Sequence, residues 1–181
     1  MSIARPCPIP DRTLLARCQG AGAYVDCYAA EIARCVSQPE YVEAFYTGAV
    51  FKLERFLLAQ LARKPSTDAQ ARELAAGAAG TFAAWRVEER SADQLLLCDF
   101  RGRTRSWLMS EPAAAGSGMC TRLYFGSAVM PMPDKATGQM KLGFAFDALL
   151  GFHKLYSRVL LNAACARLER SSGSIDPTAD H

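Results

Sequence analysis

The hydrophobic positions of this chain follow a helical period most clearly near its C-terminal end, over residues 143–168. Apolar side chains recur there at steps of three or four, namely Leu149, Phe152, Tyr156, Leu160 and Ala163. Such spacing lines up side chains along one side of an α-helix. We therefore predict a long amphipathic helix here, with a wide apolar face on which a sheet could lie.

The first third of the chain predicts one strand followed by helices. Residues 24–32 begin with strand-forming side chains and alternate weakly. Ser37 and Glu40 have the spacing of a capping box, and Pro39 suits the first helical turn, so a helix is expected to begin there. Two further helical patterns follow, at residues 50–61 and 66–76.

The period then changes from helical to strand-like. Four short segments rich in aromatic or β-branched residues are separated by turn-like residues, at 81–89, 94–101, 104–111 and 119–130. They predict an antiparallel meander, which brings the count to about five strands.

The short connection through Gly102 allows the two faces of this meander to be separated. If Arg101 and Gly102, or Gly102 and Arg103, form a two-residue turn, odd positions before the turn lie opposite even positions after it. The side chains of the two strands then fall on two definite faces of the sheet. One carries Leu96, Cys98, Phe100, Arg105, Trp107 and Met109, and the other Leu95, Leu97, Asp99, Thr104, Ser106 and Leu108. We expect the first, more aromatic face to be the interior one; a three-residue turn would instead place Asp99 beside Trp107.

The order of strand, helices, meander and long terminal helix predicts an α+β fold. In it a curved antiparallel sheet wraps around the C-terminal helix, with two or three helices between the first strand and the meander. We expect a single domain over residues 21–169. A proline-containing N-terminal arm (1–20) and a disordered tail (170–181) flank it.

Composition and charge narrow the class of protein. At 181 residues, with 50% hydrophobic and 22% charged residues, the chain suits one ordinary soluble domain. Its net charge of +3 is small and dispersed, so nucleic acid is not expected as a partner. No stretch reaches the roughly 18 apolar residues of a membrane span, and the N-terminus lacks the apolar run of a signal peptide. We expect a cytoplasmic protein without integral membrane contact.

The cysteines and histidines exclude several kinds of site. The seven cysteines include no C-x-x-C pair, which argues against a disulfide framework and a thiolate metal site. We interpret them as small buried hydrophobic residues in a reducing cytoplasm. Only His153 and His181 are present, too few for a multi-histidine metal centre. Neither a metal nor another cofactor is expected.

Several segments together resemble a known family. They are Phe45-Tyr46, residues 50–55 (VFKLER), 82–87 (FAAWRV), 94–99 (QLLLCD) and 151–156 (GFHKLY). Over roughly residues 24–168 the chain is similar to a bacterial family of START-like proteins of the broad helix-grip (SRPBCC) type, whose function is not assigned. The resemblance implies a cavity between sheet and terminal helix, used across the superfamily for lipids, sterols, polyketides or aromatic ligands, and carries over no catalytic residue.

The strand count differs from that of the helix-grip type, whose sheet commonly has six or seven strands. A further strand is therefore expected near residues 141–145 or within the N-terminal arm; otherwise the sheet is reduced.

His153 is the main candidate for chemistry, since its pKa near neutrality suits an acid or base and its ring could hold a ligand carboxylate. The alternative is a core histidine bonded to backbone or to Tyr156.

Asp99 is either solvated at a strand end or paired with Arg86 or Arg122. The aromatic residues of the sheet either stack on a ligand or simply form core. The candidate ligand-binding residues are Trp85, Phe100, Arg105, Trp107, Met109, Arg122, Tyr124, His153 and Tyr156.

Three functions follow from these features. The first is binding of a hydrophobic small molecule, with or without a carboxylate, between sheet and C-terminal helix. The second is an enzyme, such as a cyclase, dehydratase or hydrolase of aromatic or polyketide-like compounds, that uses His153. The third is a non-catalytic interaction module or homodimer, motivated by apolar residues on both predicted sheet faces.

Overall fold

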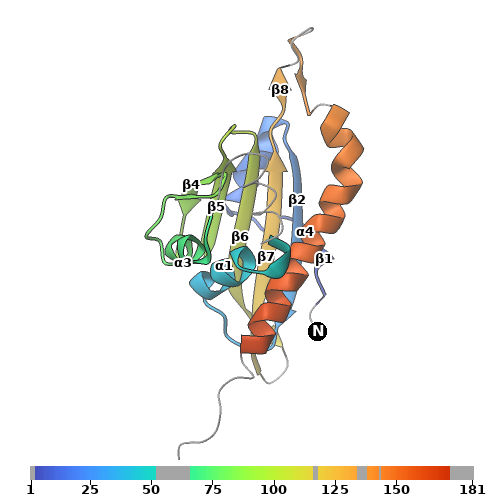
Figure 1. Cartoon of the computed structure of the whole chain (residues 1–181). Helices are drawn as coiled ribbons and strands as arrows, with labels where there is room; N and C mark the ends of the chain where they lie inside the picture. Colours follow the sequence, from blue (N-terminus) through green and yellow to red (C-terminus); the bar gives the residue numbers. More distant parts are fainter. Residues whose placement is uncertain (1–2, 52–65, 116–117, 134–137, 143, 172–181) are drawn as a thin grey trace, which may run out of the picture.

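The chain folds into one antiparallel sheet with α-helices against one of its faces, as the computed structural model in Figure 1 shows. The structure describes residues 3–51, 66–115, 118–133, 138–142 and 144–171. The predicted α+β class, with a long C-terminal helix on an antiparallel sheet, is confirmed.

The main sheet has seven strands in the order β1-β2-β7-β6-β5-β4-β3, and all of its neighbours are antiparallel. Its strands are β1 (Arg5–Pro6), β2 (Tyr24–Ile32), β3 (Thr81–Phe82), β4 (Trp85–Arg90), β5 (Gln94–Asp99), β6 (Thr104–Ala115) and β7 (Gly118–Val129). A separate two-stranded sheet joins β8 (Met132–Pro133) to β9 (Met140–Lys141). The first long strand therefore lies beside the last strand of the meander.

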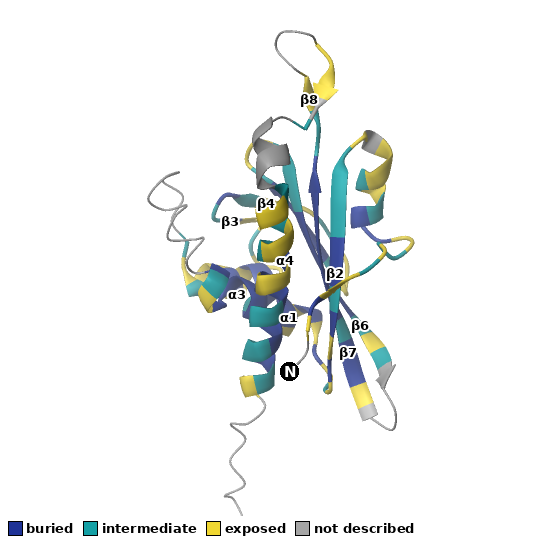
Figure 2. Ribbon diagram, turned by 90° about the vertical axis from the view of Figure 1, so that its right-hand side faces the viewer, coloured by how far each residue is buried: buried dark blue, intermediate teal, exposed yellow. Residues whose placement is uncertain are grey.

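Three α-helices have described bounds, at α1 (Gln38–Tyr46), α3 (Asp68–Ala75) and α4 (Phe144–Ser171), and η1 (Leu15–Ala21) is a 3-10 helix. Helix α4 packs on β2 and β7, and α1 packs on α3, α4 and β6. In Figure 2 the sheet is seen nearly edge-on, with α1, α3 and α4 on one side of it. The helix predicted at 50–61 lies almost entirely outside the described residues.

The local signals of the first half of the chain are confirmed. The first strand spans the predicted residues, and α1 begins with the predicted capping box, in which Ser37 accepts from the Glu40 amide and Glu40 accepts from the Ser37 amide. The strand predicted at 81–89 is divided into β3 and β4 by Ala83, whose φ is +52°. The strand expected in the N-terminal arm is β1, whereas β9, near residue 141, pairs only with β8.

The register predicted across Gly102 is confirmed, because Leu96 pairs with Trp107 and Cys98 with Arg105. The connection runs from Phe100 to Arg103, longer than the predicted two-residue turn, and Gly102 within it has a φ of +70°, a left-handed conformation that glycine adopts readily. The choice of interior face is wrong. The face toward α1 and α4 carries Leu95, Leu97 and Leu108, and Phe100 lies beyond the end of β5 with 57% of its surface exposed.

The opposite face is buried as well, under the N-terminal segment. Leu14 and Leu15 cover it, and together they form a second core with Cys27, Leu96, Trp107, Met109, Tyr124 and Ala128. The side-chain oxygen of Gln94 accepts hydrogen bonds from the Leu14 amide (2.9 Å) and from Trp107 Nε1 (3.0 Å). The described part of the segment expected as an arm thus packs on the sheet. This cover is the reason why the aromatic face is not the one that meets the helices.

Candidate functional site

A cavity of about 170 Å³ lies between the sheet and α4. Its walls are largely aromatic and come from α1, the sheet, α4 and Phe51: Phe45, Phe51, Trp85, Phe125 and Tyr156. Leu160 adds an aliphatic wall. Such a space is below the ~300–1,000 Å³ of ordinary drug-sized sites, but a dry cavity of ~150 Å³ is large enough to bind benzene.

One side of the cavity carries a buried polar network. Asp26 of β2 and Ser127 of β7 are direct cross-strand partners, and Ser127 Oγ donates to Asp26 Oδ1 at 2.6 Å. His153 Nε2 of α4 lies 2.8 Å from Ser127 Oγ and 3.4 Å from Asp26 Oδ2. The His153 side chain keeps 26% of its surface exposed and that of Asp26 only 10%. This network joins α4 to β2 and β7, the two strands on which the helix packs.

The hydrogen-bond directions assign the His153 tautomer. Since the Ser127 hydroxyl proton goes to Asp26, the serine oxygen is left to accept from a protonated Nε2. In the neutral form of the ring, Nδ1 is then the nitrogen that carries the lone pair. Ser127 is therefore not arranged as a nucleophile, because a serine nucleophile donates its proton to the histidine.

Two tyrosines complete the network around Asp26. The hydroxyls of Tyr24 and Tyr28 approach Asp26 Oδ2 at 3.4 and 3.5 Å. Burial and, after it, the nearby Asp26 charge raise the pKa of Tyr28 to about 12, and the same two causes raise the pKa of Tyr24. Both hydroxyls consequently stay protonated and act as donors to Asp26 at physiological pH.

Two buried polar groups at the cavity have no hydrogen-bond partner among the described residues. They are the indole Nε1 of Trp85 and the hydroxyl of Ser157, a residue that is 1% exposed. Ser106, by contrast, lies 3.3 Å from the Tyr46 hydroxyl. An unmade hydrogen bond in a buried position costs about 1–3 kcal/mol, so a bound molecule that completed these bonds would gain affinity.

The structure places the predicted site residues in different surroundings. Trp85, Arg105, His153 and Tyr156 line the cavity. Trp107, Met109 and Tyr124 belong to the second core, on the other face of the sheet. Arg122 pairs with Glu31 (2.6 Å) on that same outer side, and Phe100 lies exposed in the turn. Only the first four are therefore brought together.

The polar residues of the β5–β6 turn are engaged within the chain. The Arg105 guanidinium bonds to Glu88 (3.0 and 3.3 Å) and to the Gly102 carbonyl (2.8 Å). Asp99 accepts from the backbone amides of Arg103 and Thr104, at 2.7 and 3.2 Å, and so caps the turn. Neither of the alternatives weighed for Asp99, a solvated end or an arginine pair, describes this role.

Sequence reasoning did not find the polar residues Asp26, Ser127 and Ser157 of the site. Asp26 stands between apolar residues of a strand, which is a signal for a buried carboxylate in need of partners. The two serines give no such signal, because serine is common on strands and helices of every kind.

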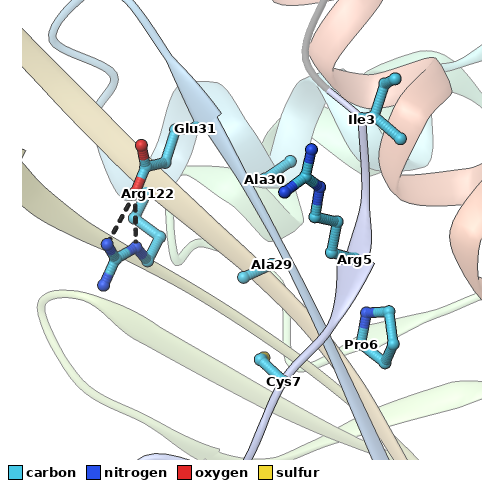
Figure 3. A pocket seen from close by; sticks show the side chains of 8 residues that line it. All are labelled: Ile3, Arg5, Pro6, Cys7, Ala29, Ala30, Glu31 and Arg122. Carbon is cyan, nitrogen blue, oxygen red and sulfur yellow. Dashed lines mark hydrogen bonds and ion pairs between the residues drawn. The ribbon is translucent and has the colours of Figure 1, made fainter. Parts of the chain in front are cut away.

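A second, larger pocket of about 460 Å³ lies on the outer side of the sheet, where β1 pairs with β2. Figure 3 shows Arg5, Cys7 and the Glu31–Arg122 ion pair around it. Its volume lies within the range of ordinary small-molecule sites.

The comparisons with known proteins add no relative: no family model and no curated protein matches the chain. Within the described residues, no cluster of three or more His, Cys, Asp or Glu side chains could hold a metal ion. In the same part of the chain, no helix is both long and apolar enough to cross a bilayer.

Proposed function

We propose that this protein binds a small hydrophobic molecule in the cavity between the sheet and α4, as a START-like protein of the helix-grip type. The observation that carries the proposal is an aromatic cavity with two buried polar groups, Trp85 Nε1 and Ser157 Oγ, that no other described residue meets with a hydrogen bond. The seven-stranded antiparallel sheet and the long terminal helix support the helix-grip relationship.

The ligand that suits this cavity is a single aromatic ring bearing a hydrogen-bond acceptor. The ring would contact the aromatic walls, and the acceptor would receive the Trp85 indole proton. A neutral acceptor is favoured over a carboxylate, because Asp26 already lies beside His153 and the Arg105 guanidinium is bound to Glu88.

Matched probes test both parts of the proposal. Acetophenone and benzamide, which are neutral, are compared with benzoate by saturation-transfer NMR and isothermal titration calorimetry. We expect the neutral probes to bind and Trp85→Phe to weaken them about tenfold, the equivalent of one lost hydrogen bond. Tighter binding of benzoate would overturn the choice of a neutral ligand.

A variant that fills the cavity separates specific binding from surface adsorption. Ser157→Leu places a larger apolar side chain at a buried wall and should abolish binding, whereas Ser171→Leu, on an exposed position of the same helix, should not. Circular dichroism verifies that both variants are folded. Binding that survives Ser157→Leu unchanged, or a failure of every probe to bind, would refute the cavity as the ligand site.

Acid–base catalysis is a second candidate, favoured by the partial exposure of His153 and the network that orients its ring. In this function Nδ1 would remove a proton from a carbon next to a bound carbonyl group. Deuterium uptake at the methyl group of acetophenone in D₂O, followed by NMR, would report that step. The candidate requires exchange above the buffer rate that is lost in His153→Gln; exchange at the buffer rate leaves binding as the function.

A further inference from the structure

Two cysteines far apart in the sequence meet on the outer side of the sheet. The register of β1 on β2 pairs Arg5 with Ala29 and Pro6 with Tyr28, so Cys7 stands opposite Cys27. The Cys7 amide donates to the Cys27 carbonyl at 3.0 Å, and the two Sγ atoms are 3.5 Å apart. Directly opposed residues of an antiparallel pair have Cα atoms about 5.5 Å apart, within the span of a disulfide.

The two thiols differ in access. Cys27 is 4% exposed and belongs to the second core, whereas Cys7 is half-buried and lines the 460 Å³ pocket. The hydrogen bond between the two thiols lowers the pKa of Cys7, burial opposes this shift, and the Arg122 charge lowers the pKa further. The same hydrogen bond and burial raise the pKa of Cys27. A half-buried thiol with a lowered pKa and a buried second thiol are thus held side by side.

The arginine side chains at the pocket around Cys7 favour an anionic ligand. Arg5 is exposed at the pocket wall, where the structure gives its guanidinium no ion pair among the described residues. Arg122 stands on the opposite wall beside Glu31 (Figure 3). The pocket is therefore open to carboxylates close to a thiol.

We propose that Cys7 and Cys27 form a dithiol site that is reversibly oxidised by an anionic low-molecular-weight disulfide bound in the pocket beside β1. The Cys7 thiolate attacks one sulfur of the small disulfide, which forms a mixed disulfide and releases one small thiolate. Cys27 then attacks Cys7 Sγ, its proton passes to the departing second small thiolate, and the Cys7–Cys27 disulfide results. The protein loses two electrons and the small disulfide gains them.

The experiment compares two small disulfides of opposite charge on the full-length protein. Reduced protein is incubated with oxidised glutathione, which is anionic, or with cystamine, which is cationic. Free thiols are then alkylated, and the disulfides are mapped by mass spectrometry after non-reducing digestion. We expect a Cys7–Cys27 disulfide to form first, to form faster with glutathione, and to be reversed by reduced glutathione.

Variants assign the roles of the two thiols and of Arg5. Cys27→Ser should stop the reaction at a mixed disulfide on Cys7, and Arg5→Gln should slow the glutathione reaction about threefold without slowing that of cystamine. Cys18→Ser, a half-buried thiol of the same outer side, is the matched control and should change nothing.

Disulfide mapping of the wild-type protein tests the Cys7–Cys27 proposal even if a variant fails to fold. Modification confined to the exposed Cys35, or a Cys7–Cys27 pair that stays reduced in excess oxidised glutathione, would overturn the proposal. Equal rates with both disulfides would overturn the anionic specificity. The proposed ligand cavity lies on the other face of β2, so either proposal can fail without the other.

Discussion

Gly126 occupies a position in β7 where three parts of the chain meet. A Cβ atom there would lie 2.4 Å from Leu15 Cδ2, 3.0 Å from the Asp26 carbonyl oxygen and 3.1 Å from Trp107 Cε3. Trp107 is its partner across the sheet. The missing side chain thus allows the N-terminal segment to lie directly on the sheet.

Gly126→Ala should therefore destabilise the fold by about 1–3 kcal/mol, the usual cost of overpacking a core. Gly151→Ala is the matched control: it lies on an exposed position of α4 with nothing within 4 Å of the added carbon. This change should instead stabilise by about 0.5–1 kcal/mol, since alanine favours a helix. Urea denaturation measures both. Unchanged stability of Gly126→Ala would contradict the close approach of Leu15.

At the same scale, His153 illustrates how far single residues can be predicted. Its place on a long helix follows from the apolar period of 143–168, and its place beside a cavity was an expectation that rested on the family resemblance. Its hydrogen-bond partners do not follow from that period. Ser127 is 26 residues away from His153 in the sequence, and Asp26 is 101 residues away from Ser127. Hydrogen bonds that join β2, β7 and α4 link segments far apart in the sequence, so they leave no pattern in the residues around His153.

Among the elements, α1 is the one whose start is encoded most directly. Ser37 and Glu40 close the capping box, and Arg34 adds a hydrogen bond to Glu40 at 3.1 Å. The pKa of Glu40 is lowered first by the Ser37 amide, then through its side-chain hydrogen bonds and the Arg34 charge, against the opposing effect of burial. The box thus links the stability of the fold to the ionisation of one carboxylate.

The pH dependence follows from the direction of that shift. A carboxylate with a lower pKa in the folded state stabilises above its unfolded pKa of about 4.3, and this contribution is lost as pH falls through the folded value. Wild type should be more stable than Glu40→Gln at pH 6, and the difference should shrink toward pH 3. Ser37→Ala should cost about 1 kcal/mol at pH 6.

Urea denaturation at several pH values measures these differences, with Glu73→Gln, an exposed glutamate of α3, as the control. A difference between wild type and Glu40→Gln that stays constant down to pH 3 would mean that the carboxylate does not stabilise the helix start.

On the scale of the whole molecule, one sheet separates two cores. The inner core lies under α1, α3 and α4, and the outer core lies under the N-terminal segment. Apolar residues on both sheet faces, which motivated the homodimer prediction, are thus covered within a single chain. Phe152 and Leu155 of α4 stay 65% and 59% exposed, so a homodimer stays a prediction on separate grounds.

The outer core should be as important for stability as the inner one. Leu15 is fully buried in it, and Leu15→Ala should cost about 2–5 kcal/mol through lost burial and the cavity left behind. Ile3→Ala, in the same N-terminal segment but 61% exposed, should change stability by less than about 0.5 kcal/mol. Chemical denaturation compares the two. A small effect of Leu15→Ala would show that the segment is a dispensable cover.

The sequence by itself determined the elements and the pairing of the meander. Capping residues, helical spacing and the turn at Gly102 act over a few residues, so their consequences are written locally. They sufficed for the strand at 24–32, the start of α1, the register of Leu96 on Trp107 and the α+β class.

Only the tertiary structure decided which face of the sheet meets the helices and which polar residues meet at a site. Both faces are apolar, and alternation separates two faces without telling which cover each receives. That choice depended on Leu14 and Leu15, which cover the Trp107 face and leave the other to α4. The groups at the inner cavity and the Cys7–Cys27 pair are likewise products of contacts between distant segments, which no local period encodes.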